Sequence, residues 1–255
     1  MALVTGASSG IGRAFAVALA QRGCQLVVVA RRRSRLEELA AELKVVSGHD
    51  VEVLASDLTE PGSLADVEAR LSDRERPVDL LINNAGVGGS GPFTGQTADH
   101  EEAEIRLNVV APTRLASAAL CGMVERGRGG IVNVSSIAGV QAVPFLATYA
   151  ATKAYLNSFS LALHEEMRGK GVAVVALLPG MTRTEFHAAA GLDRSSVPGP
   201  AWLSAEEVAE AGLVALERGR AVAVPKAGYR VFVGLSRVTP LAINRRLAGL
   251  VGRQL

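Results

Sequence analysis

The chain has 255 residues, of which 49% are hydrophobic and 20% charged, and its formal net charge is +2. This is the composition of an ordinary globular chain with ample core, and it does not resemble that of a disordered or fibrous protein. The length fits one α/β domain. Cys24 and Cys121 lack metal-ligand spacing and the four histidines form no cluster, so no metal site is expected. We expect buried, reduced thiols in a cytoplasmic protein, since the start of the chain shows no signal peptide.

The first motif, Thr5–Gly12, lies between a short apolar strand and a helix with apolar residues at Ile11, Phe15 and Leu19. Its glycines allow a tight turn and a close approach of a pyrophosphate to the free N–H groups at the helix start. The first two glycines are spaced more widely than in the usual dinucleotide fingerprint. The motif therefore indicates a different branch of dinucleotide-binding proteins.

A second strand, residues 25–30, ends in Arg31, Arg32 and Arg33. Dinucleotide-binding folds that use NAD place an acidic residue at this strand end, where it binds the ribose 2′-hydroxyl. No acid is present here, and guanidinium groups would pair with a 2′-phosphate. The sequence therefore favours NADP(H), although a solvated basic helix start is the alternative interpretation.

The alternation of strands and helices continues with strands at 51–54 and 78–82 and a helix around 64–71. Asp57 follows the first of these strands, and Asn83–Gly86 follow the second. We expect Asp57 to accept from an adenine amino group and the small residues after 82 to let the cofactor ribose lie against backbone. A long helix over 98–126 contains Pro112, which cannot donate to the carbonyl of Asn108, so a loosened turn able to hold a water is predicted there.

The next strand, residues 131–136, ends in Ser135 and Ser136, and a helix from about Tyr149 to Met167 follows. Tyr149 and Lys153 are four residues apart, so they project from one helix face. A positive charge beside the phenol would lower the pKa of Tyr149 toward working pH and suit it for general acid–base catalysis. On these residues alone, a solvated pair on the helix and capping hydroxyls at the strand end are the alternatives.

A continuous apolar strand, 172–178, is of the kind buried in parallel sheets. Residues 181–203 show no sustained periodicity of apolar residues and are interpreted as a substrate lid. Ser204 and Glu207 match a capping box that begins a helix through about Arg218, and 221–224 is the last predicted strand.

The region after Glu217 contains no acidic residue, and its arginines and lysine alternate with apolar residues. We divide the chain into a domain over 1–225 and a basic apolar extension over 226–255. This extension is expected to pack on the domain or at a subunit contact, as a subunit-contact or substrate-lid helix with a solvated basic face. An amphipathic segment lying on an anionic membrane is the alternative. It lacks a recognisable nucleic-acid-binding motif, so no nucleic-acid partner is expected.

Together these motifs resemble the short-chain dehydrogenase/reductase family over nearly the full length. Thr5–Gly12 matches the Thr-Gly-x-x-x-Gly-x-Gly element, Asn83–Gly86 the Asn-Asn-Ala-Gly element, and Pro179-Gly180 the segment near the nicotinamide amide. The Arg-rich helix start and the stretch at 179–186 are similar to an NADP-preferring bacterial branch of the family that has a basic C-terminal extension. The chain departs from the family in having only four residues before Thr5. The resemblance implies a single-domain, Rossmann-type, doubly wound parallel sheet of about seven strands flanked by helices.

The resemblance also implies a catalytic set and a mechanism. The set is Asn108, Ser136, Tyr149 and Lys153. The cofactor would give hydride to a carbonyl whose oxygen Ser136 polarises and Tyr149 protonates, while Asn108 holds a water that connects Lys153 to solvent. The implied cofactor-binding residues are Gly6, Ser8, Ser9, Gly10, Ile11, Gly12, Arg31, Arg32, Asp57, Leu58, Asn84, Ala85, Gly86, Tyr149, Lys153, Pro179, Gly180, Thr182 and Thr184.

The substrate is expected to be a bulky apolar ketone or aldehyde, because the residues predicted to line its site are mostly apolar. The predicted substrate-binding residues are Ser136, Val143, Phe145, Tyr149, Met181 and Phe186, with Phe93, Leu146 and Trp202 as further wall candidates. The basic strand end favours reduction with NADPH. A dinucleotide-binding redox sensor or scaffold without turnover is the alternative, and the presence of both Tyr149 and Lys153 counts against it. The family resemblance implies a homodimer or homotetramer.

Overall fold

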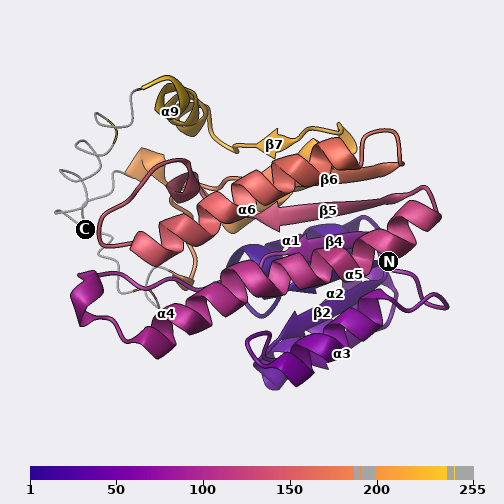
Figure 1. Ribbon diagram of the computed structural model, residues 1–255. Helices are drawn as coiled ribbons and strands as arrows, with labels where there is room; N and C mark the ends of the chain where they lie inside the picture. Colours follow the sequence, from indigo (N-terminus) through magenta and orange to yellow (C-terminus); the bar gives the residue numbers. More distant parts are fainter. Residues whose placement is uncertain (187–189, 191–198, 240–243, 245–255) are drawn as a thin grey trace.

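The computed structural model describes residues 1–186, 190, 199–239 and 244 (Figure 1). Two predictions extend beyond this part of the chain. Residues 187–189 and 191–198 of the predicted lid lie outside the described residues. So do residues 240–243 and 245–255 of the predicted C-terminal extension.

Seven parallel strands form one sheet in the order β3-β2-β1-β4-β5-β6-β7. The strands are β1 (Ala2–Thr5), β2 (Leu26–Ala30), β3 (Val51–Ala55), β4 (Leu80–Asn83), β5 (Gly129–Val134), β6 (Val172–Leu177) and β7 (Val222–Ala223). The order reverses between β1 and β4, where a doubly wound sheet opens a crevice at its carboxyl edge. The predicted Rossmann-type fold is confirmed.

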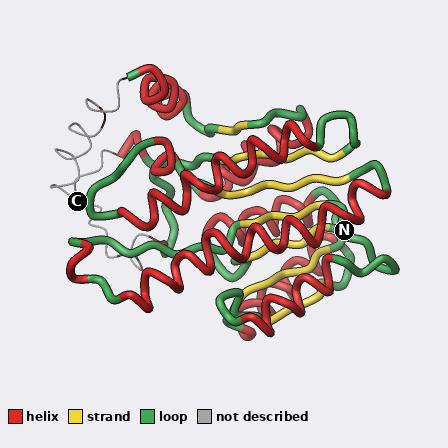
Figure 2. The backbone as a smooth tube through the Cα atoms, viewed as in Figure 1, coloured by secondary structure: helices red, strands yellow, loops and turns green. Residues whose placement is uncertain are grey.

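Helices cover both faces of the sheet, with the strands between them (Figure 2). On one face α1 (Gly10–Gln21), α2 (Arg33–Ser47) and α8 (Ala205–Glu217) share a buried apolar cluster with the strands. On the other face α3 (Pro61–Leu71), α5 (Ala111–Glu125) and α6 (Ala147–Glu166) form a second cluster. The inner strands are buried on both sides, which explains their mostly apolar sequences, whereas the edge strand β3 is only half-buried and contains Glu52.

The remaining helices lie around the carboxyl edge of the sheet. They are α4 (Ala98–Ile105) and α9 (Ala227–Val238), with short 3₁₀ turns η1 (Phe93–Gly95), η3 (Ile137–Val140) and η4 (Gly199–Ala201). The predicted capping box at the start of α8 is confirmed: Ser204 Oγ accepts from the Glu207 backbone N–H at 3.1 Å, and the Glu207 carboxylate accepts from the Ser204 N–H at 2.8 Å. This box fixes where α8 begins.

The loosened turn predicted before Pro112 is confirmed. Residues Arg106–Val110 form one π-helical turn, η2, between α4 and α5. Proline lacks the N–H that would bond to Asn108, so the helix widens by one residue at this point. The run Ala98–Glu125 is also long and apolar enough to cross a membrane by length and composition. Its buried face, including Leu115 and Met123, packs on the sheet, and core helices pass the same test.

Two predictions differ from the structure. Strand β5 ends at Val134, before the predicted end at Ser136, because Ser136 instead caps η3 by accepting from the Ala138 N–H at 3.0 Å. The two cysteines are free, but Cys24 is only half-buried and Cys121 is exposed. The expectation of two buried thiols was therefore wrong, because Cys121 lies on the solvent side of α5.

Candidate active site

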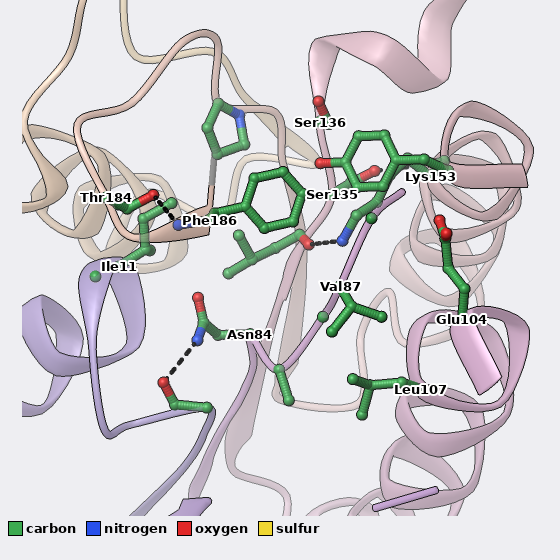
Figure 3. A pocket seen from close by; sticks show the side chains of 18 of the residues that line it. Ile11, Asn84, Val87, Glu104, Leu107, Ser135, Ser136, Lys153, Thr184 and Phe186 are labelled. Carbon is green, nitrogen blue, oxygen red and sulfur yellow. Dashed lines mark hydrogen bonds between the residues drawn. The ribbon is translucent and has the colours of Figure 1, made fainter. Parts of the chain in front are cut away.

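A cavity of about 810 Å³ opens at the carboxyl edge of the sheet. The ends of β1, β2, β4 and β5 contribute to it, together with α4, α6 and the segment after β6. Figure 3 shows Ile11, Asn84 and Thr184 on one side and Ser136, Lys153 and Glu104 on the other. A cavity of this size accommodates a large ligand.

The glycine turn after β1 is built for close backbone approach. Gly6 and Gly10 have φ values of +64° and +54°. A Cβ on Gly6 would lie 2.7 Å from the Asn84 side-chain nitrogen and 2.9 Å from the Ala85 Cα. A Cβ on Gly12 would lie 2.3 Å from the Gly6 carbonyl oxygen. Gly12 does not line the cavity, so its role is packing beneath the turn, in contrast to the predicted ligand contact.

The same turn is tied to β4 by hydrogen bonds. The Thr5 hydroxyl accepts from the N–H groups of Asn84 and Ala85, at 2.9 and 3.0 Å. The Asn84 side-chain amide donates to the Thr5 carbonyl at 2.9 Å. These contacts join two segments about 80 positions apart in the chain, and they leave Ser8, Ser9 and Gly10 facing the cavity.

Basic side chains stand where the second strand ends. Arg32 donates to the Ser8 hydroxyl at 3.1 Å, and Arg31 lies 3.9 Å from the Asp57 carboxylate. Asp57 itself accepts from the backbone N–H and hydroxyl of Thr59, at 3.0 and 2.7 Å. The two arginines line the cavity together with the carboxylates of Asp57 and Glu185, so this end of the cavity offers guanidinium groups to an anion.

Ser136, Tyr149 and Lys153 of the predicted catalytic set all line the cavity. Lys153 is buried, and its Nζ donates to the Val134 carbonyl at 3.0 Å, at the end of β5. The same Nζ lies 5.7 Å from the centroid of the Tyr149 ring. The Ser135 hydroxyl donates to the Lys153 carbonyl at 2.9 Å, which holds α6 against β5.

Burial controls the titration of this pair. It raises the pKa of Tyr149 to about 12, although a hydrogen bond with Ser136 lowers that pKa and the Glu104 charge raises it further. It also lowers the pKa of Lys153 to about 8, against an opposing effect of Glu104. The sequence predicted that Lys153 would lower the pKa of Tyr149. In the structure the pKa of Tyr149 is instead raised, because the loss of hydration outweighs the charge effects at this depth.

Asn108 lies behind the cavity wall. Its side-chain oxygen accepts from the Val87 N–H at 3.0 Å, and its amide donates to the Val87 carbonyl at 2.8 Å and to Thr152 Oγ1 at 3.2 Å. Asn108 does not line the cavity. It joins the widened turn of η2 to the loop after β4 and to α6, and so holds the loop that carries Gly86.

Most other predicted residues are brought together at the cavity. Its lining includes Gly6, Ser8, Ser9, Gly10, Ile11, Arg31, Arg32, Asp57, Leu58, Asn84, Ala85, Gly86, Val143, Leu146, Pro179, Gly180, Met181, Thr182, Thr184 and Phe186. The Phe186 ring packs against Tyr149 with centroids 5.4 Å apart.

Three predicted wall residues were wrong for this cavity: Phe93, Phe145 and Trp202 do not line it. Phe93 and Phe145 line a separate cavity of about 30 Å³ instead. Phe145 has a φ of +65°, and Gly91 N–H donates to its carbonyl at 2.9 Å. This left-handed turn directs the chain at Phe145 away from the large cavity, which spacing along the sequence does not reveal.

Glu104, His100 and Phe232 also line the cavity and were not predicted from the sequence. Glu104 lies on α4 four residues before Asn108, but the widened turn between them breaks the regular helical spacing, so the sequence carries no clear signal for its place at the cavity. Phe232 comes from α9. The neighbouring Tyr229 hydroxyl donates to the Ala201 carbonyl at 2.8 Å and accepts from the Met181 N–H at 3.2 Å. The described part of the C-terminal extension therefore forms part of the cavity wall.

A family model described as short chain dehydrogenase matches residues 1–195. The chain belongs to the short chain dehydrogenase family. Among solved structures of this family, a short-chain dehydrogenase from Sphingobium yanoikuyae in complex with NADPH is 42% identical. It covers 92% of this chain and 93% of its own, with a TM-score of 0.84.

A second similar structure, the bulky-bulky ketone specific alcohol dehydrogenase from Comamonas testosteroni, is 36% identical. It covers 92% of this chain and 91% of its own, with a TM-score of 0.81. A very-long-chain 3-oxoacyl-CoA reductase of Anas platyrhynchos is 33% identical over 190 residues, which are 72% of this chain and 60% of that protein. The chain thus spans about three fifths of the length of this curated relative.

Proposed function

We propose that the protein is an NADP(H)-dependent oxidoreductase that interconverts a carbonyl and an alcohol, and that it reduces a bulky apolar ketone or aldehyde. The observation that carries this proposal is the meeting of Ser136, Tyr149 and Lys153 in one large cavity with the glycine turn after β1. Membership of the short chain dehydrogenase family supports the reaction class.

The residues at the cavity fit a nicotinamide dinucleotide. Gly6 and Gly10 line the cavity beside the N-terminus of α1, where a pyrophosphate is favoured, and a Cβ at either position would crowd Asn84 or Thr184. Arg31 and Arg32 would hold a 2′-phosphate, with Ser8 beside them. Asn84–Gly86 and Pro179–Thr184 would enclose the rest of the molecule. When bound, this cofactor supplies or accepts a hydride.

The chain's own residues would handle the oxygen of the substrate. The Ser136 hydroxyl would donate a hydrogen bond to the carbonyl oxygen, and the Tyr149 hydroxyl would deliver the proton that makes it an alcohol. Lys153 would bond the cofactor ribose and supply positive charge to the resulting phenolate. Asn108 would hold the backbone around Val87 at the widened turn. A water held at this turn would return a proton to Lys153 from solvent.

The apolar character of the substrate side supports a bulky carbonyl compound. Val143, Leu146, Met181, Phe186 and Phe232 line this part of the cavity. Burial of apolar substrate surface against these side chains would contribute about 25 cal/mol per Å². The Comamonas testosteroni alcohol dehydrogenase is described as specific for bulky-bulky ketones, and this supports the same substrate class by similarity.

The test is turnover of a panel of ketones and aldehydes with NADPH and NADH by the purified protein, with Tyr149→Phe as control. We expect tighter binding of NADPH, faster turnover of long-chain or ring ketones than of small polar carbonyls, and loss of turnover in Tyr149→Phe. Faster turnover of small polar carbonyls would contradict the substrate class. Cofactor binding with full turnover in Tyr149→Phe would contradict the mechanism, and binding without turnover of any carbonyl would favour a dinucleotide sensor.

A further inference from the structure

Glu104 is a buried carboxyl group that the mechanism above does not use. It is 1% exposed and lies on α4. One carboxylate oxygen, Oε2, accepts from the Gly89 N–H at 3.2 Å. The other, Oε1, is buried and has no hydrogen-bond partner among the described residues. Burying a carboxyl group with one oxygen unpaired is unfavourable, so a structural role alone does not account for it.

The position of Glu104 links it to the proposed catalytic pair. Glu104 and Lys153 lie on the same side of the large cavity (Figure 3), which Tyr149 also lines. Glu104 and Tyr149 in addition share the wall of the 30 Å³ cavity, a volume that can hold a water molecule. A water in this second cavity would lie beside Glu104 and outside the large cavity.

The titratable groups that act on Glu104 come from two helices. Glu101 and His100 lie on α4, and Lys153 and Tyr149 on α6. Burial raises the pKa of Glu104 to about 7, and the Glu101 charge raises it further. The Gly89 N–H, His100 and Lys153 oppose the shift. Both charge states of Glu104 are thus populated near neutral pH, while Lys153 Nζ remains bonded to a backbone carbonyl.

We propose that Glu104 is a positioning residue whose charge state sets the protonation of Tyr149 and Lys153. Ionised Glu104 keeps the phenol protonated and the ammonium charged, which is the form needed to reduce a carbonyl. Neutral Glu104 removes that bias and favours the phenolate needed to oxidise an alcohol. This inference rests on the proposed function, because it assigns Glu104 a role in the balance between the two directions of that reaction.

The first test is the pH profile of kcat/KM for alcohol oxidation in Glu104→Gln. Glutamine keeps the size and the bond from Gly89 but carries no charge. The alkaline rise of the profile is expected to move to lower pH by about one unit. Glu102→Gln is the matched control: Glu102 is on the same helix but is exposed and paired with Arg106, so its profile should match wild type. Glu104→Asp should restore most of the wild-type profile. A wild-type profile in folded Glu104→Gln would overturn the proposal.

The second test needs no substrate or cofactor. Infrared titration follows the C=O band of protonated carboxyl groups, and the Glu104 component is the part lost in Glu104→Gln. In Lys153→Met this component should persist to higher pH, because a cation that favours ionised Glu104 has been removed. If the pH midpoint of the Glu104 component is unchanged in Lys153→Met, the coupling between Glu104 and Lys153 is overturned. If the coupling is present but no alcohol or carbonyl turns over, the proposed function fails and the electrostatic link stands.

Discussion

Arg35 and Glu185, 150 positions apart in the chain, form an ion pair in which one guanidinium nitrogen donates to both carboxylate oxygens at 3.0 and 3.1 Å. Glu185 also lies 3.5 Å from Arg32. The pair connects α2 to the segment after β6, directly beside the arginines assigned to a 2′-phosphate. All three side chains are partly exposed, so each contact contributes little to stability.

The location of Glu185 predicts an effect on cofactor affinity. In Glu185→Gln, the carboxylate no longer competes for Arg32 or repels a bound phosphate, so the Kd for NADPH should fall about two- to fivefold. The Kd for NADH, which lacks the phosphate, should not change. Isothermal titration calorimetry measures both. Glu37→Gln, on α2 and paired with Arg33, is the control with the same change of charge. Weaker NADPH binding in Glu185→Gln would instead mean that Glu185 orients Arg32.

A buried polar chain between β4, β5 and α6 predicts a large stability effect. Asn133 is fully buried; its oxygen accepts from the Asn83 amide at 2.9 Å, and its own amide donates to Ser160 Oγ at 2.9 Å. Asn133→Ala removes both bonds, leaves Asn83 and Ser160 only their bonds to the Pro112 and Leu156 carbonyls, and opens a cavity, so the free energy of unfolding should fall by about 2–4 kcal/mol. Ser160→Ala removes only the last hydrogen bond of this polar series, so it should lower the free energy of unfolding by about 1 kcal/mol. Urea denaturation checks both, and equal losses would contradict the network.

Gly180 permits close packing of α9. A Cβ at this position would lie 2.1 Å from the nearest atom of the Tyr229 ring, which both Ala201 and Met181 hold in place. Gly180→Ala should therefore lower the free energy of unfolding by about 1–3 kcal/mol.

Two further variants isolate this contact. With Tyr229→Leu added, the loss should be smaller than the sum of the single losses, because the clash disappears. Gly228→Ala, where a Cβ meets nothing within 4 Å, should be neutral or stabilising, since alanine favours the helix. Additive losses in the double variant would show that the ring moves freely.

Glu104 predicts a pH dependence of stability. Its pKa rises from 4.5 in the unfolded chain to about 7 in the fold. Between these values the folded protein binds more protons than the unfolded chain, so the free energy of unfolding falls as pH rises. At about 1.4 kcal/mol per pKa unit, the loss approaches about 3 kcal/mol by pH 7.

This slope should disappear in Glu104→Gln, when denaturation is measured between pH 5 and 7. Lys153 does not disturb that window, since its lowered pKa of about 8 acts only at higher pH. Parallel pH curves for wild type and Glu104→Gln would contradict a raised pKa of Glu104. Glu102→Gln, which should retain the slope, controls for the change in net charge.

Structural features that depend only on nearby residues in the chain were predictable from the sequence. Apolar runs identified the strands, Pro112 predicted the widened turn before α5, and Ser204 with Glu207 predicted the start of α8. Each of these rests on hydrogen bonding or side-chain periodicity within a few residues. Once the sheet is parallel, its strand ends must meet at one edge, so Gly6 and Arg32 could be assigned to one site from the sequence. Tyr149, on α6, was assigned to the same site by the family resemblance.

Packing between segments far apart in the chain decided the features of the site that the sequence did not predict. The left-handed turn at Phe145 took that ring out of the large cavity, and α9 brought Phe232 into it. Burial set the direction of the pKa shifts of Tyr149 and Lys153 and made Glu104 a buried acid beside them. Desolvation depends on every atom that surrounds a group. The sequence determined which chemical groups reach the carboxyl edge of the sheet, and only the tertiary structure decided their charge and their neighbours.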